Sequence, residues 1–210
     1  MYGIVRLILC LFIYIGLRNL IARSKIKRKK GLQISAVIGI VVIYSGMFFV
    51  PFENLFVTFD SPIAVYNYSH LGGTNIKVEI EGEYSSCIVD FESESKTTFA
   101  IIPKEENGWK ITTGFDDKIV FSAFTGGVSA NVYQFKDTND YYISILDLTK
   151  EESTIVDEYD TEFQSLVFRN DKGVITDAWH YAYIPYFDSQ YTITVNGNKV
   201  EFQEYKGLFK

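Results

Sequence analysis

Hydrophobic residues form long unbroken runs near the start of the chain and alternate with polar residues farther along it. The longest uncharged run extends from Gly31 to Phe52 and holds 22 residues. At about 1.5 Å of rise per residue, a helix of this length reaches roughly 33 Å, which is enough to cross a ~30 Å hydrocarbon core. Soluble folds rarely contain such runs, so residues 31–52 are predicted to be a transmembrane helix.

A second apolar segment occupies residues 1–22. Only 11 residues separate Arg6 from Arg18, which is too short to span a membrane alone. The segment becomes long enough when it extends from Tyr2 to Ile21 and both arginines reach toward the membrane interfaces. The alternative is a helix that lies on the membrane surface or re-enters it. No small-residue cleavage site follows, so a cleaved signal peptide fits poorly.

The loop between the two segments, residues 23–30, is strongly basic, with six positive charges in eight residues. Lys and Arg resist translocation, so this loop is predicted to stay in the cytoplasm. The chain from about residue 53 onward is then extracytoplasmic. The first 52 residues carry a net charge of +8 and the remainder carries −14. Such an acidic remainder argues against a nucleic-acid partner, whose phosphates need a basic surface.

Residues 53–210 show the composition of an antiparallel all-β region. They are rich in Tyr, Phe, Ile, Val and Thr, and turn signals recur about every ten residues. The predicted architecture is therefore an N-terminal transmembrane helical hairpin followed by a mainly antiparallel all-β extracytoplasmic region, either a β-sandwich or two small β subdomains.

The clearest hairpin lies in residues 191–202. A two-residue turn at Asn196 and Gly197 supplies the positive φ angles of a type I′ turn. This turn pairs Ile193 with Val200 and places the apolar residues of both strands on one face.

A second hairpin is predicted in residues 76–89. A two-residue turn at Gly82 and Glu83 pairs Ile80 with Ser85, and the same register again gathers the apolar residues on one face.

Further strands are predicted at 97–102, 109–113, 118–124, 128–135, 141–148, 163–169 and 178–184. The stretch 61–69 fits a short helix, because Ser61 followed by Pro62 suits a helix start, and fits a strand about equally well. The turn-rich stretch 112–118 suggests a boundary between a β subdomain at 53–115 and a second one at 116–210.

Four stretches together resemble small membrane-anchored envelope proteins of Gram-positive bacteria. They are "FDSP" at 59–62, "ENGWKI" at 106–111, "DYYISI" at 140–145 and the closing "YTITVNGNKVEF". The resemblance would cover most of the β region and implies a bacterial cell envelope, but it carries no active site. Proteins of this kind place acidic residues after the Ser-Pro, where this chain has Ile63 and Ala64.

Motifs for catalysis and for metal binding are missing from the sequence. It has no glycine-rich phosphate loop, no paired-cysteine site and no His-Glu-x-x-His. The two histidines, His70 and His180, are far apart in sequence, and Ser129 in "GVSAN" lacks the second glycine of a nucleophile elbow. We therefore predict no catalytic residue, metal or cofactor.

Three aromatic residues are the weak candidates for ligand binding. In a strand at 178–184, alternation places Trp179, Tyr181 and Tyr183 on one face. Such a row can stack on a sugar or a peptide, but large aromatics more often fill a β core.

These patterns lead to three functional hypotheses. The first is a membrane-tethered extracytoplasmic β module, a non-enzymatic binding or accessory protein of the cell envelope. Its partners would be the lipid bilayer and another membrane or envelope protein. The second is an envelope hydrolase that acts on wall glycan or peptide through paired carboxylates. The third is an immunity or stress-protection protein at the cell surface.

Overall fold

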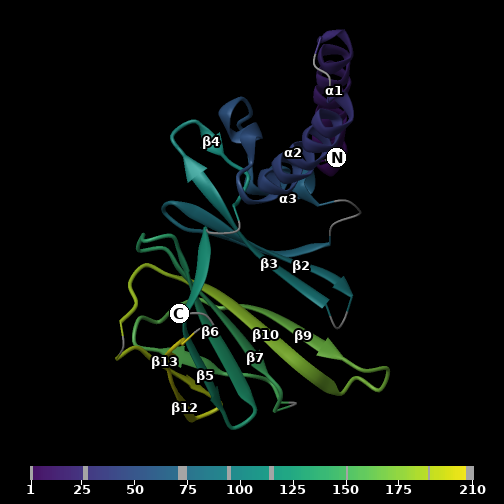
Figure 1. Ribbon diagram of the computed structural model, residues 1–210. Helices are drawn as coiled ribbons and strands as arrows, with labels where there is room; N and C mark the ends of the chain where they lie inside the picture. Colours follow the sequence, from purple (N-terminus) through teal and green to yellow (C-terminus); the bar gives the residue numbers. More distant parts are fainter. Residues whose placement is uncertain are drawn as a thin grey trace.

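The computed structural model describes residues 2–25, 28–70, 75–93, 96–113, 116–149, 151–188 and 190–206. Two long helices, α1 (Tyr2–Arg23) and α2 (Lys29–Phe49), lie side by side and project from a β region (Figure 1). Both helices are long and apolar enough to cross a membrane. The predicted second segment ends slightly early, because Val50 precedes Pro51 and is therefore extended.

Two short helices connect the helix pair to the sheets. They are the 3-10 helix η1 (Phe52–Leu55) and the α-helix α3 (Pro62–Ser69). The Ala64 amide donates a hydrogen bond of 3.1 Å to the Ser61 hydroxyl, which caps α3. The stretch that fitted both helix and strand is thus a helix, and burial of Val65 and Tyr66 offsets the low helix propensity of its β-branched residues.

The strands form three sheets, and their pairings are antiparallel. The first sheet has the order β1-β2-β3-β4, with β1 Ile76–Glu81, β2 Ser85–Ser93, β3 Lys96–Glu105 and β4 Gly108–Trp109. The second has the order β13-β5-β6-β7-β10-β9, with β5 Asp117–Thr125, β6 Val128–Phe135, β7 Tyr141–Asp147, β9 Gln164–Arg169, β10 Ile175–Ile184 and β13 Gln203–Glu204. The third has the order β12-β11-β8, with β8 Ile155–Asp157, β11 Thr192–Val195 and β12 Asn198–Glu201. The mainly antiparallel all-β prediction is confirmed.

The elements stack in layers, and each layer packs on the next through a separate apolar cluster. Helix α3 covers one face of the first sheet around Tyr66, Ile88 and Ile102. The first and second sheets share a core that includes Cys87 and Tyr181. The opposite face of the second sheet packs against the third sheet in a cluster of residues from β6, β7, β10, β11 and β12. The second sheet is therefore covered on both faces.

The register predicted for residues 191–202 is confirmed. Ile193 pairs with Val200 and Val195 with Asn198, and Asn196 and Gly197 both have positive φ angles. All the information for this hairpin is local, since the turn residues alone specify its geometry.

The register predicted for residues 76–89 is wrong by two residues. Ile80 pairs with Cys87 instead of Ser85, and the last pair is Glu81 with Ser86, so four residues, 82–85, separate the paired positions. A shift of two keeps each side chain on its predicted face, so the hydrophobic pattern could not reveal the error. The longer turn is held from outside by Asp140, the residue directly before β7 of the second sheet.

The remaining predicted strands correspond to observed strands, except at 109–113. There the pairing stops at Trp109, because the Ile111 backbone bonds instead to the Asn54 side chain. The chain passes from the first sheet to the second between β4 and β5, within the turn-rich stretch 112–118.

Candidate functional site

The surface of the helix pair is almost wholly apolar and exposed. Phe12 and Leu20 of α1 are 68% and 67% exposed, and Val42 of α2 is 64% exposed. Soluble proteins rarely leave such large contiguous apolar patches in water. The helix pair is therefore a candidate membrane anchor.

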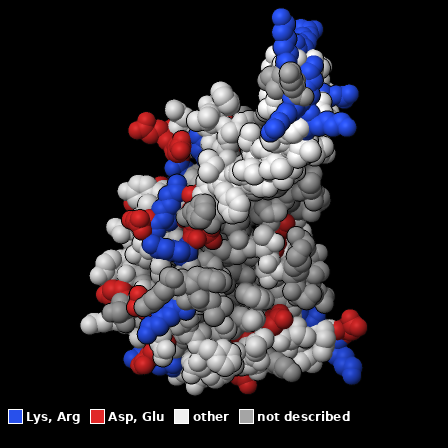
Figure 2. Space-filling model, in the orientation of Figure 1, with Lys and Arg blue, Asp and Glu red and all other residues white. Residues whose placement is uncertain are grey.

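Charge is distributed unevenly along this anchor. Lys and Arg side chains without Asp or Glu beside them gather at the end of the helix pair away from the sheets, whereas side chains of both signs lie over the β region on this face (Figure 2). The basic end includes Arg23, Lys25 and Lys29, and Lys29 Nζ donates to the Ala22 carbonyl at 2.8 Å. The orientation in which this basic end lies in the cytoplasm stays a prediction of the positive-inside rule.

The opposite end of the anchor is joined to the β region by a buried ion pair. Arg6 Nε and Nη2 donate to Glu53 Oε1 and Oε2 at 2.8 and 2.7 Å, and the two side chains are 0% and 4% exposed. The guanidinium carbon also lies 5.9 Å from the Phe52 ring centre. A bidentate pair of this kind fixes both the distance and the orientation between α1 and η1.

This pair gives Arg6 a partner that the sequence did not predict. Its side chain is fully buried and bonded to a residue 47 positions away, and the expectation that it reaches toward the membrane interface stays a prediction. In the sequence, the lack of acidic residues before Glu53 indicated a division between a basic and an acidic part of the chain, and it did not indicate a partner for Arg6. The signal that could have found the pair is the isolation of Glu53, which is the only charged residue between Lys30 and Asp60.

The environment of the pair extends to α3. Burial is the main reason why the pKa of the Tyr68 phenol is raised, the Glu53 carboxylate raises it further, and Arg6 opposes them. Tyr68 of α3 thus lies close enough to Arg6 of α1 and Glu53 of η1 for their charges to act on it.

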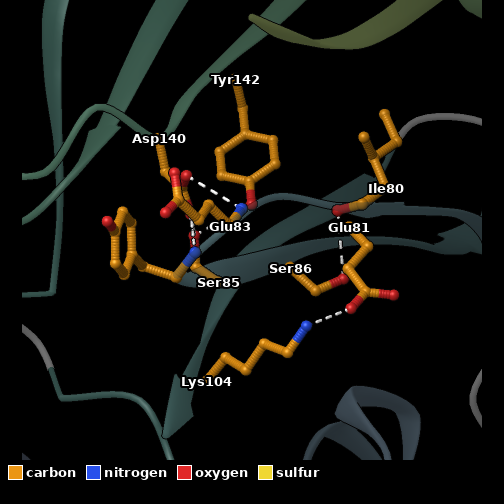
Figure 3. Close-up of polar contacts among 9 residues, drawn as sticks. Ile80, Glu81, Glu83, Ser85, Ser86, Lys104, Asp140 and Tyr142 are labelled. Carbon is orange, nitrogen blue, oxygen red and sulfur yellow. Dashed lines mark hydrogen bonds and ion pairs between the residues drawn. The ribbon is translucent and has the colours of Figure 1, made fainter. Parts of the chain in front are cut away.

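A second buried carboxylate joins the first and second sheets. Asp140, fully buried, accepts hydrogen bonds from the Glu83 and Tyr84 amides at 3.1 and 2.8 Å and from the Ser85 hydroxyl at 2.7 Å (Figure 3). The Tyr183 hydroxyl donates a further bond at 3.1 Å. Four donors around one carboxylate offset the cost of burying it.

Close packing at the same place explains Gly82. A Cβ atom there would lie 2.6 Å from Tyr142 Oη and 2.8 Å from Asp140 Oδ2. The turn between β1 and β2 therefore packs closely against the start of β7, and this contact joins the first sheet to the second.

This turn forms one wall of an open groove. The groove has a volume of about 580 Å³ and is lined by Glu83, Tyr84, Lys104, Glu105, Glu106 and Asn107. Lys104 is itself paired with Glu81, and its Nζ lies 5.4 Å from the Trp109 ring centre (Figure 3). The Asp140 contacts hold the backbone of Glu83 and Tyr84, which form this wall of the groove.

The aromatic row predicted from alternation is present, but it faces the first sheet. Trp179, Tyr181 and Tyr183 lie on the face of β10 that packs against β1 and β2, and Tyr181 is only 2% exposed. Trp179 and Tyr181 are stacked on each other, with ring centres 6.1 Å apart. In this position the row fills the core between two sheets.

The histidines and cysteines lie apart from one another. His70 stacks on Tyr66 at the end of α3, while His180 is buried in β10 with Nδ1 2.7 Å from the Ser165 hydroxyl. Cys10 and Cys87 are both buried free thiols, and burial raises the pKa of the Cys87 thiol well above its usual value. Among the described residues, no group of three His, Cys, Asp or Glu side chains is arranged to hold a metal.

Comparison with known proteins gives no relative from which a role could be transferred. No protein-family model matches the chain, and neither the curated proteins nor the solved structures contain a significant match.

Proposed function

We propose that the chain is a membrane-anchored protein whose β region is held outside the cytoplasm, next to the membrane, to bind another component of the cell envelope. The observation that carries this proposal is the polarity of the helix pair. The helix pair has a basic end, exposed apolar side chains along its length, and the buried Arg6–Glu53 ion pair at the end next to the β region.

Each part of this arrangement has a membrane role. The helices contain 22 and 21 residues, which at about 1.5 Å per residue is enough for a ~30 Å core. The two helices are close in length and pack side by side, which favours α1 as a spanning helix over a surface helix. The neutralised Arg6 leaves no isolated charge at the outer end of α1.

The β region supports a binding role more than a catalytic one. Asp140 and Asp147 are buried, and their carboxylates accept hydrogen bonds from amides and hydroxyls of neighbouring loops. These bonds hold the loops in place and leave the two carboxylates inaccessible to a substrate. Tethering near the membrane raises the effective concentration of the β region around partners located there. The proposal is therefore a non-enzymatic module of a bacterial envelope.

Membrane extraction tests the anchor. After alkaline carbonate treatment of bacterial membranes, the full chain should stay in the membrane pellet. Release of the full chain into the supernatant would contradict the proposed anchor.

Cross-linking tests the binding role. A photo-reactive residue in place of Asn107, in the open groove, should yield a discrete cross-linked product in membranes. The matched control is the same residue in place of Asp171, an exposed position in the β9–β10 loop. A product pattern identical at both positions would contradict a specific surface at the groove.

A further inference from the structure

The segment that follows α2 exposes large hydrophobic side chains beyond the end of that helix. We define the apolar loop as residues 50–57. Val50, Leu55 and Phe56 are 67%, 79% and 81% exposed, although Leu and Phe are usually buried. These side chains need an apolar environment that the chain itself does not supply.

The backbone beneath these side chains is firmly held. The Asn54 side chain donates to the Ile111 carbonyl and accepts from the Ile111 amide, both at 2.8 Å. Lys110 Nζ donates to the carbonyls of Asn54 and Val57 at 2.9 and 3.1 Å. The loop therefore presents Leu55 and Phe56 on a fixed support, as an interaction surface requires.

The same contacts make the loop suited to lipid. Its amides at Asn54, Phe56 and Val57 bond to carbonyls within the loop, so polar backbone groups are satisfied internally. Its only charged residue is Glu53, which Arg6 neutralises in the buried ion pair. Within the loop itself, neither an unpaired charge nor these backbone groups would oppose contact with acyl chains, and the Lys110 ammonium that lies against it bonds to the carbonyls of Asn54 and Val57.

Position identifies the bilayer as the occupant. The apolar loop continues directly from the end of α2, and Figure 1 shows it beside β4, turned back toward the helix pair above the sheets. We infer that Leu55 and Phe56 insert into the outer leaflet of the membrane that holds α1 and α2. They form a third membrane contact that sets the orientation of the β region on the membrane surface. This inference rests on the proposed anchor.

Tryptophan fluorescence in lipid tests the insertion. The full chain is reconstituted in phosphatidylcholine bilayers whose acyl chains carry bromine, a short-range quencher, and the emission of the parent chain is subtracted. The variant Phe56→Trp should show blue-shifted emission and lose most of its added fluorescence. Phe124→Trp is the matched control, because Phe124 is 77% exposed and lies in β5 of the second sheet. It should emit like a water-exposed indole and stay unquenched.

Val42→Trp, in the middle of α2, separates the two proposals. Quenching of Val42→Trp without quenching of Phe56→Trp would overturn the loop insertion and leave the anchor intact. Absence of quenching at Val42→Trp would contradict the anchor itself. A blue shift at Phe56→Trp without quenching would show that protein, from a second copy or another chain, covers the loop, and would also overturn the inference.

Discussion

At the scale of single residues, two buried carboxylates connect parts of the chain that are distant in sequence. Glu53 pairs with Arg6 across 47 positions, and Asp140 binds the turn at 83–85 across more than 50. The sequence does not identify the partner of either carboxylate, although Glu53 stands out as an isolated charge, because an acidic residue in a loop is usually solvated. Burial and bond geometry, which only the folded chain supplies, distinguish these carboxylates from the many exposed ones.

The Arg6–Glu53 pair leads to a first prediction. Removing one partner, in Arg6→Leu or Glu53→Leu, leaves a buried charge and should lower the free energy of unfolding by about 3–5 kcal/mol. The double variant should recover much of that loss, since two apolar side chains leave no charge unpaired. Denaturant unfolding in detergent micelles, followed by tryptophan fluorescence, measures these changes.

The control for this prediction is the exposed pair of Lys118 and Asp137, whose carboxylate side chain is 97% exposed. Asp137→Ala should leave the unfolding midpoint unchanged. Equal stability of Arg6→Leu and the parent chain would show that the pair does not join α1 to η1.

The second prediction concerns Asp140. Replacing it by Ala leaves the buried Ser85 hydroxyl and the part-buried Glu83 and Tyr84 amides without their acceptor, which should cost about 1–3 kcal/mol. Asp171→Ala, in an exposed loop, serves as the matched control and should have little effect. Denaturant midpoints compare the two variants, and similar midpoints for both would rule out the inter-sheet role.

At the scale of elements, local sequence information was sufficient for most strands and both long helices. The hairpin at 191–202 is correct because Asn196 and Gly197 determine its turn. The register predicted for the hairpin at 76–89 is wrong because Asp140, which is distant in sequence, binds and stabilises a longer turn. The strand at 109–113 is truncated for the same kind of reason, since Asn54 competes for its backbone. In the candidate anchor, the two helices and the basic residues at one end of them could be predicted from the sequence. The Arg6–Glu53 ion pair that joins α1 to η1 could not.

Two carboxylates, Asp157 in β8 and Asp147 in β7, hold the loops beside the third sheet, and this gives a third prediction. Burial acts to raise the pKa of Asp157, but hydrogen bonds from Thr161 and Tyr191 outweigh it and hold that pKa below its usual value. Burial acts on Asp147 in the same way, and bonds from Thr149 and Ser153 again lower the pKa.

The sign of the effect follows from the direction of these shifts. A carboxylate with a lowered pKa in the folded state stabilises it fully above the unfolded value of about 3.9, and the stabilisation is lost as pH falls through the folded pKa. Hydrogen exchange should therefore show β8 and β11 opening more readily as the pH drops below about 4. Asp157→Asn should weaken this dependence, and an unchanged profile in that variant would contradict the assignment.

At the scale of the whole molecule, the layers share their cores. Cys87 and Ile101 of the first sheet pack in one cluster with Tyr142 and Tyr181 of the second. Division of the β region into 53–115 and 116–210 stays a prediction, and the shared cluster argues that the two parts depend on each other for stability.

The shared core leads to a fourth prediction, a single cooperative unfolding transition. Trp109 reports on the cluster beneath α3, and Trp179 reports on the core between the first two sheets. The variants Trp109→Phe and Trp179→Phe each leave one tryptophan as the reporter. In both variants, the unfolding midpoint from tryptophan fluorescence should coincide with the midpoint from circular dichroism, which follows the loss of secondary structure. Two separate transitions would instead indicate independent subdomains.

The sidedness of the chain is the claim on which the functional proposal depends. Two single-cysteine additions test it most directly, Asp137→Cys in the turn between β6 and β7 and Lys25→Cys in the basic loop. Both parent residues are exposed, and the native Cys10 and Cys87 are buried, so background labelling should be low. With a membrane-impermeant maleimide on intact bacterial cells, we predict labelling at position 137 and labelling at position 25 only after the membrane is opened. Labelling at position 25 in intact cells, with protection at position 137, would contradict the account.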